Sequence, residues 1–107
     1  IKAADLSIKA AQKNQDANEL RLSQQYNQAI REAVKNRTSV EYYINKALPT
    51  ANLITGQSRK AFESGELDFT TLLFNLRQPL TIREGYLTSL QQYNQSIITL
   101  QYLNGNK

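Results

Sequence analysis

Apolar side chains recur every seven residues through much of the first half of the chain. One row of this pattern consists of Tyr26, Ala33, Val40, Ala47, Ile54 and Ala61. A complementary row holds Ile30, Ile44 and Ala51, with polar interruptions at Arg37 and Ser58. Two such rows are typical of a coiled-coil-like helix. Because the first row contains three alanines, we expect close helix approach with little apolar area buried.

The second half carries a stripe with the same helical spacing. It begins with Phe69, Leu72, Leu73, Leu76 and Leu80, and it continues with Tyr86, Leu90, Tyr93, Ile97 and Leu100. Leu103-Asn-Gly105 is typical of a helix end. The pattern predicts a helix over residues 69–103. The helix-packing seam that we predict for both halves consists of Tyr26, Ile30, Val40, Ile44, Ile54, Leu72, Leu73, Leu76, Leu90, Tyr93, Ile97 and Leu100.

A short segment, residues 64–68, separates the two halves. Gly65 can adopt the left-handed conformation that ends a helix, and Asp68 can cap a helix that begins at Phe69. A connection this short makes the two helices antiparallel neighbours. The sequence therefore predicts an all-α helical hairpin, a single segment over residues 1–107. Its descending arm covers about residues 3–63, its tip turn residues 64–68 and its returning arm residues 69–103.

Three features can interrupt these arms. Pro49 and Pro79 each remove a backbone hydrogen bond and tend to kink a helix. Thr38 and Glu41 fit a capping box, which predicts a break near residues 36–38. An uninterrupted helix with Thr38 on its surface is an equal alternative. We therefore leave open whether the first arm is one helix or two, with a break near residues 36–38 or at Pro49.

The two arms differ in length. Residues 69–103 would form a helix of roughly 50 Å, and residues 3–63 one of roughly 90 Å. If the first arm is straight, residues 1 to about 27 have no partner within this chain. We expect them to bind another chain, fold back as a third helix or be mobile. Since the sequence contains no Met and begins at Ile1, we interpret the chain as a piece of a longer protein.

Composition narrows the function classes. The chain has 107 residues and no Cys, His, Met or Trp, so the usual zinc and copper ligands and the Cys- or His-based catalytic arrangements are missing. Gln and Asn account for about a fifth of the residues. The net charge is +4, but the basic residues are spread along the first half instead of clustering as in a nucleic-acid-binding face. We expect no enzyme activity, no cofactor, no metal site and no nucleic-acid partner.

Several short motifs resemble one known family. They are Ala47-Leu-Pro49-Thr-Ala51, Phe62-Glu-Ser-Gly65, Leu72-Leu73, Gly85-Tyr86-Leu87, Leu90, Tyr93-Asn94 and Leu100-Gln-Tyr102-Leu103-Asn-Gly105. This pattern over residues 40–105 resembles the C-terminal part of the TolC-like outer-membrane efflux proteins, in particular the heavy-metal CzcC/CusC branch. It also resembles versions fused behind a CzcA-type inner-membrane pump. Phe74-Asn75-Leu76 and Pro79 depart from the family pattern.

The resemblance implies a trimeric parent channel whose helices form a periplasmic α-barrel in an outer-membrane or cell-envelope protein. It implies two further partners, a periplasmic adaptor protein and an inner-membrane pump of the RND type. Heavy-metal cations would pass through the conduit, and its amide-rich lining would bind them weakly. The residues that would dock the adaptor form the tip: Phe62, Gly65, Glu66, Leu67 and Asp68.

The same residues allow simpler interpretations. Gly65 and Phe62 can belong to an ordinary helix turn, and the acidic residues Glu63, Glu66 and Asp68 can merely solvate or cap it. For Arg77 and Arg83 we prefer surface or interhelical salt bridges. The alternative function is a generic coiled-coil hairpin, a scaffold or protein-interaction module that dimerises through its unpaired arm. In either case we expect the chain to associate in solution through residues 1–36.

Overall fold

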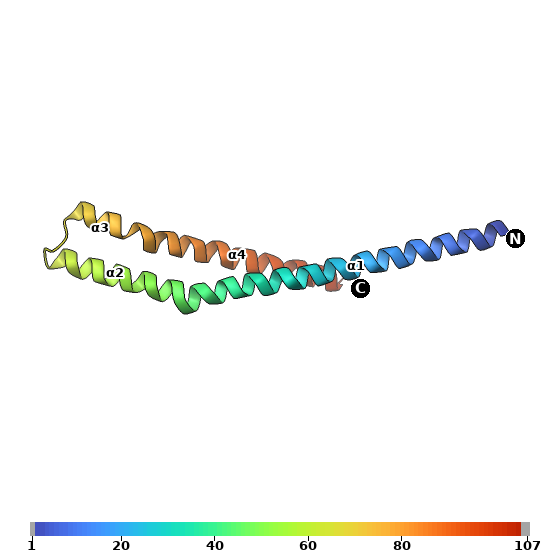
Figure 1. Cartoon of the computed structure of the whole chain (residues 1–107), viewed down its shortest axis with the longest axis horizontal. Coiled ribbons are helices and arrows are strands. Elements are labelled where there is room, and N and C mark those ends of the chain that lie inside the picture. The colour runs from blue at the N-terminus through green and yellow to red at the C-terminus, as the bar shows by residue number, and fades with distance from the viewer. Residues whose placement is uncertain (1, 106–107) are drawn as a thin grey trace.

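A computed structural model describes residues 2–105 as a long helical hairpin (Figure 1). The first arm consists of α1 (Lys2–Tyr42), a π-helical segment η1 (Tyr43–Ala47) and α2 (Leu48–Glu63). The second arm consists of α3 (Phe69–Asn75) and α4 (Arg77–Gly105). The molecule measures 93 × 21 × 16 Å. The predicted all-α hairpin is confirmed; the outermost residues of the predicted segment, 1, 106 and 107, lie outside the described part.

The helix α1 runs through residues 36–38 without a break. The Thr38 hydroxyl donates to the Val34 carbonyl oxygen at 3.0 Å, so it bonds back along the helix instead of capping a new one. Glu41 accepts from the Arg37 guanidinium at 3.0 Å, which is an ordinary i,i+4 pair. The break considered near these residues is therefore absent, because both groups of the capping box have helical partners.

Pro49 is accommodated by a π-helical turn. The Leu48 N–H donates to the Tyr43 carbonyl, five residues back, and Pro49 follows in the first turn of α2. At that position proline keeps a helical φ, while the wider turn loosens the hydrogen-bond ladder that its ring would otherwise disturb. The first arm changes direction here, in the green part of Figure 1. The chain bends before Pro49 and the helix continues beyond it.

The returning arm is two helices, not the single helix predicted over residues 69–103. A turn at Leu76 separates α3 from α4, and Pro79, which is fully buried, lies in the first turn of α4. Proline fits there because the first N–H groups of a helix have no partner within it. The other end of α4 lies at Gly105, two residues beyond the predicted end at Leu103.

The tip turn contains both of the predicted signals. Gly65 has a φ of +83°, and the Glu66 N–H donates to the Ala61 carbonyl at 2.8 Å, as at a helix end that is terminated by a left-handed residue. An Asp68 side-chain oxygen accepts from the Thr71 N–H at 2.8 Å. These contacts end α2 at Glu63 and start α3 at Phe69, so the chain reverses within five residues.

The core of the hairpin is narrow and made of small side chains. The buried apolar residues are Ala29, Ala33, Val40, Ala47 and Ala51, together with Pro79. Two serines, Ser58 and Ser89, are buried with them. Small side chains allow the arms to approach closely, but they remove little apolar surface from water. The hairpin is held by a long, thin line of contact and lacks a central cluster of large side chains.

The first part of α1, residues 2–25, extends beyond the end of α4 (Figure 1). We call it the N-terminal arm. All of its residues are exposed, whereas burial begins at Tyr26 and Ala29, where α4 comes alongside. The prediction of a long overhang is confirmed for the described residues, and the overhang continues α1 instead of folding back as a third helix.

Candidate interaction surfaces

The tip gathers the residues predicted to dock a partner. Gly65, Glu66 and Asp68 are exposed and Leu67 is half-buried. The Phe62 ring lies 6.2 Å from the ring of Phe69, measured between centroids. The apolar pattern predicts Phe69 in the packing stripe, yet 60% of its surface is exposed. The turn therefore presents two aromatic rings that flank a small acidic loop.

The hydrogen bond from Thr71 also changes the chemistry of the tip. It holds the pKa of the Asp68 carboxyl below its ordinary value, because donors to a carboxylate favour the charged form. A lowered folded-state pKa means that ionised Asp68 stabilises the helix start above its ordinary pKa of 3.8, and that this contribution is lost as the pH falls through the lower folded-state value.

The predicted packing seam is only partly covered within this chain. Val40 is buried. Eight members are half-buried: Tyr26, Ile54, Leu72, Leu76, Leu90, Tyr93, Ile97 and Leu100. Ile30, Ile44 and Leu73 are exposed. The two arms pack most closely along a row of Ala and Ser residues. They can approach there because neither arm has a bulky side chain at these positions.

Polar pairs join the arms along this line. The Asn36 amide donates to the Ser96 hydroxyl and to the Gln92 carbonyl, the latter at 3.4 Å. The Ser39 and Ser89 hydroxyls are 3.0 Å apart. The sequence pattern marked none of these positions as contacts. The sequence feature that could have indicated these contacts is the recurrence of polar residues on the apolar face. Hydrogen bonds between such residues fix the register of the two arms, which small apolar side chains alone do not.

Tyr43 packs into a notch at Gly85. A Cβ at position 85 would overlap the Tyr43 hydroxyl, so Gly85 makes room for the ring. The Tyr43 and Tyr86 rings lie 6.3 Å apart, measured between centroids. This contact joins the π-helical segment to the first third of α4. The one sequence signal was a glycine inside an otherwise helical stretch.

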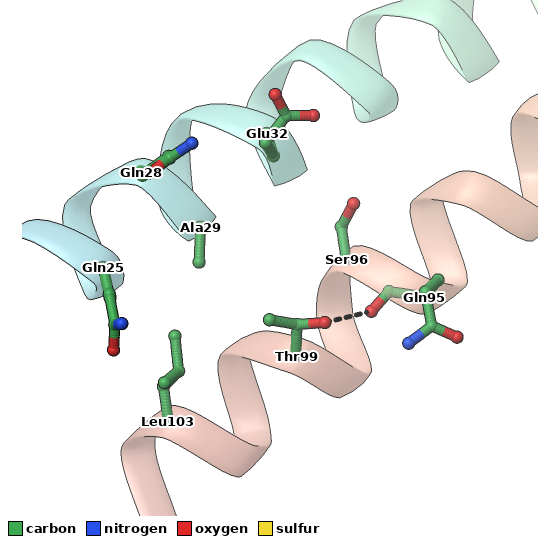
Figure 2. A pocket seen from close by; sticks show the side chains of 8 residues that line it. All are labelled: Gln25, Gln28, Ala29, Glu32, Gln95, Ser96, Thr99 and Leu103. Carbon is green, nitrogen blue, oxygen red and sulfur yellow. Dashed lines mark hydrogen bonds between the residues drawn. The ribbon is translucent and has the colours of Figure 1, made fainter. Parts of the chain in front are cut away.

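Near the end of α4 an open groove lies between the arms (Figure 2). It has a volume of about 400 Å³ and is lined by Gln25, Gln28, Ala29, Glu32, Gln95, Ser96, Thr99 and Leu103. The Thr99 hydroxyl donates to the Gln95 carbonyl at 3.0 Å, within its own helix. Glu32 is the single charged residue of this lining, so the groove presents mainly neutral amides and hydroxyls.

Large apolar side chains remain exposed on both arms. On α4 they include Leu80, Leu87 and Ile98, whose spacings of seven and eleven residues place them on one face. On the first arm they include Leu6, Leu20 and Leu53. The whole chain exposes 8543 Å², compared with about 6,100 Å² expected for a compact monomer of this mass. The excess reflects the elongated shape, 93 × 21 × 16 Å, and it is larger than the ~800 Å² that each partner buries in a standard interface.

Two kinds of site are absent from residues 2–105. None of the helices in this range combines the length and apolarity that a membrane span requires. The same residues contain no group of three or more acidic, His or Cys side chains placed to hold a metal ion. Comparisons with family models, curated proteins and solved structures give no match to this chain.

Proposed function

We propose that this chain is a non-catalytic segment of the periplasmic helical barrel of an outer-membrane efflux channel, in a tripartite heavy-metal efflux system of the RND type. The observation that carries the proposal is the pattern of coverage along the hairpin. Alanine and serine form its inner contact, while Leu87 and Leu53 remain at least 60% exposed on opposite arms. A helix in a barrel has neighbours on two sides, so this pattern fits a hairpin whose lateral faces are completed by other helices.

The distribution of charge supports a conduit role. From residue 85 to 105, α4 contains no charged residue, and its exposed polar groups are mainly Gln, Asn, Ser and Thr. Neutral amides can line a water-filled passage without holding a cation firmly, because hydrated divalent cations prefer carboxylate oxygens. Selection of the exported ion and the energy for its transport would then belong to the inner-membrane pump.

The tip is the proposed site for the periplasmic adaptor. Phe62 and Phe69 offer apolar area, and the intervening loop offers the Glu66 and Asp68 carboxylates. Aromatic side chains beside a polar rim are common in protein interfaces. The start of α3, capped by Asp68, would present them at a defined position.

A cross-linking experiment tests this proposal. Because these 107 residues contain no cysteine, the variants Glu66→Cys at the tip and Gln95→Cys on the α4 groove each place one new thiol at a defined position of this segment in cells. We expect the tip variant to cross-link to a periplasmic adaptor and the groove variant not to do so. Equal cross-linking at both positions, or a cytoplasmic partner at the tip, would reject the adaptor role.

A cellular assay tests the transport part of the proposal. Deletion of the gene should sensitise the host to heavy-metal cations, and the wild-type gene should restore growth. A tip variant, Phe62→Asp with Phe69→Asp, should be produced at normal levels and fail to restore it. Unchanged metal tolerance after deletion would contradict a role in metal efflux.

The exposed N-terminal arm favours a second candidate, a scaffold module in which a coiled-coil hairpin binds another protein through residues 2–25. This function requires neither the envelope nor an adaptor. Fractionation of cells that carry the tagged parent protein separates the two: envelope fractions agree with the channel, and purely cytoplasmic recovery agrees with the scaffold.

A further inference from the structure

A second groove lies near the tip, where α2 faces the junction of α3 and α4. It is open, has a volume of about 500 Å³, and is lined by Ile54, Gln57, Ser58, Phe74, Asn75, Arg77 and Gln78. Arg77 is its single charged residue, and three neutral amides surround it. Ile54 and Phe74 supply apolar walls. The lining thus combines one cation, several hydrogen-bond donors and two apolar surfaces.

The Arg77 guanidinium has no hydrogen bond or ion pair within the described residues. Arg37 pairs with Glu41, and Arg83 donates to the Asn52 side-chain oxygen at 3.2 Å and to the Thr55 hydroxyl at 3.4 Å. Arg83 therefore joins the two arms, as predicted in part, but to neutral partners. Arg77 is exposed and, like Arg59, has no such partner within the described residues, but Arg77 is the arginine that lines this groove. Arg77 joins nothing in the described chain, and all of its donors remain available.

Ser58 is an independent sign of a binding site. It is 7% exposed, and Ser89, the other buried serine, has Ser39 as a hydrogen-bond partner. Ser58 has no partner within the described residues. Every fully buried polar side-chain atom in residues 2–105 has a hydrogen-bond partner. Because the Ser58 hydroxyl has none, it is not fully buried and accounts for part of the residue's 7% exposure. Because Ser58 lines the groove, this exposed part faces the groove.

We propose that this groove binds an organic carboxylate. The planar guanidinium of Arg77 suits the two oxygens of a carboxylate, and the Ser58 hydroxyl can donate to one of them. The amides of Gln57, Asn75 and Gln78 can supply further donors. Apolar walls at Ile54 and Phe74 favour a carboxylate attached to a hydrocarbon stem over a fully hydrated inorganic anion.

Two sources of this chemistry are an acidic side chain of another polypeptide and a small free carboxylate. The inference rests on the groove alone and stands whether or not the chain belongs to an efflux channel. It concerns a face between α2 and the α3–α4 junction, separate from the loop of the tip. Failure of the adaptor cross-link would therefore leave it untouched, and its own failure would leave the adaptor role untouched.

A titration of the ¹⁵N-labelled 107-residue chain, followed by NMR, tests the proposal. The probes are N-acetyl-glutamyl amide, its neutral counterpart N-acetyl-glutaminyl amide, butyrate and inorganic phosphate. We expect saturable shifts of the Arg77 side-chain N–H and the Ser58 backbone N–H with the glutamyl probe. The glutaminyl probe should cause no saturable shift, and phosphate should bind more weakly than the glutamyl probe.

Variants sharpen the result. Arg77→Gln should weaken binding of the glutamyl probe by about tenfold, because it removes a charge-assisted pair. Ser58→Ala should weaken it by about threefold, the loss of one weaker hydrogen bond. Arg83→Gln is the matched control on the same helix and should leave the affinity within about twofold, since Arg83 does not line the groove. Helical circular dichroism verifies that each variant folds.

Each outcome of the titration either supports or overturns carboxylate binding. Tighter binding of the glutamyl probe than of butyrate supports an acidic side chain as the ligand, and the reverse order supports a small free carboxylate. Equal response to the glutamyl and glutaminyl probes, phosphate as the tightest ligand, or equal losses from Arg77→Gln and Arg83→Gln would each overturn carboxylate recognition. Absence of any saturable shift would overturn the site itself.

Discussion

The N-terminal arm and the rest of α1 have similar sequence patterns, but only the rest of α1 is covered by another helix of this chain. Beyond residue 26, the line Ala29, Ala33 and Val40 is buried against α4. Counting back from Ala29 at helical spacing, the same face of the N-terminal arm holds Leu22, Ala11, Ile8 and Ala4, with amides at Gln15 and Asn18. These residues are all exposed. The arm thus carries a continuation of the packing stripe, but no helix of this chain covers it.

This contrast shows how the hairpin depends on its surroundings. A helix of small side chains gains little from burying one stripe, so most of its stability must come from packing along its whole length. Where α1 packs against α4, hydrogen bonds such as that from Asn36 to Ser96 also fix the register of the two helices. In the arm, no helix of the described chain supplies either contribution. We therefore expect the two parts to respond differently to the same substitutions.

The largest difference should appear when a small seam residue is enlarged. Ala51 has no exposed surface, so Ala51→Leu must push the arms apart and should lower the free energy of unfolding by about 3 kcal/mol. The matched variant Ala11→Leu lies on the exposed arm and should change it by less than about 0.5 kcal/mol. Urea unfolding followed by circular dichroism measures both. Equal losses would mean that the arm is packed as tightly as the hairpin.

A pair of glycine variants should give effects of opposite sign. Gly85→Ala brings a Cβ against the Tyr43 hydroxyl and should destabilise the chain by about 1 kcal/mol, as overpacking outweighs the better helix propensity. Gly56→Ala meets no atom within 4 Å and should stabilise it by about 0.5–1 kcal/mol. Thermal unfolding of both variants checks the signs. Stabilisation by Gly85→Ala would show that Tyr43 does not occupy the notch.

The smallest effect should come from pH at the tip. Since the folded-state pKa of Asp68 is lowered, its stabilising contribution should be complete above pH 3.8 and decline as the pH falls through the lower folded-state pKa. Asp68→Asn, which keeps a capping side chain, should remove this part of the pH dependence. Glu66→Gln, two residues earlier, is the control and should retain it. Unfolding midpoints of the three proteins, measured between pH 2 and pH 6, compare them.

Some of this fold was predictable because its causes are local. The left-handed Gly65 and the capping Asp68 act within a few residues of themselves, so the tip could be placed from the sequence. The overhang followed from comparing the lengths of the two periodic segments. The tip and the overhang both depend on local conformation and helix length, which are nearly independent of the rest of the molecule.

Other features depend on distant contacts and escaped prediction. The sequence predicts interruptions at Pro49 and Pro79, but it does not predict their form, which is a π-helical segment before Pro49 and a turn at Leu76 before Pro79. Tyr43 finds its notch only because Gly85 comes alongside from the other arm. The heptad rule placed Ile30, Ile44 and Leu73 in the seam, yet these residues are exposed. A periodic stripe identifies apolar faces, and it cannot say which helix covers which face.

Groove chemistry was harder still to foresee. In the sequence, Ser58 is a polar interruption in an apolar row, and Arg77 is predicted to be a surface or salt-bridge residue. Their shared groove is formed by residues from α2, α3 and α4. The chemistry of the groove depends on which of its polar groups have no hydrogen-bond partner. Identifying those groups requires the positions of all the neighbouring side chains.

Amide hydrogen exchange along α1 distinguishes the part of this helix that packs against α4 from the N-terminal arm, which no helix of the described chain covers. In dilute solution, amides of residues 5–22 should exchange at least about 100-fold faster than those of residues 29–40, and the difference should shrink at concentrations where the chain associates. Uniform protection along α1 at every concentration would contradict the account, because the arm would then be stable without a partner.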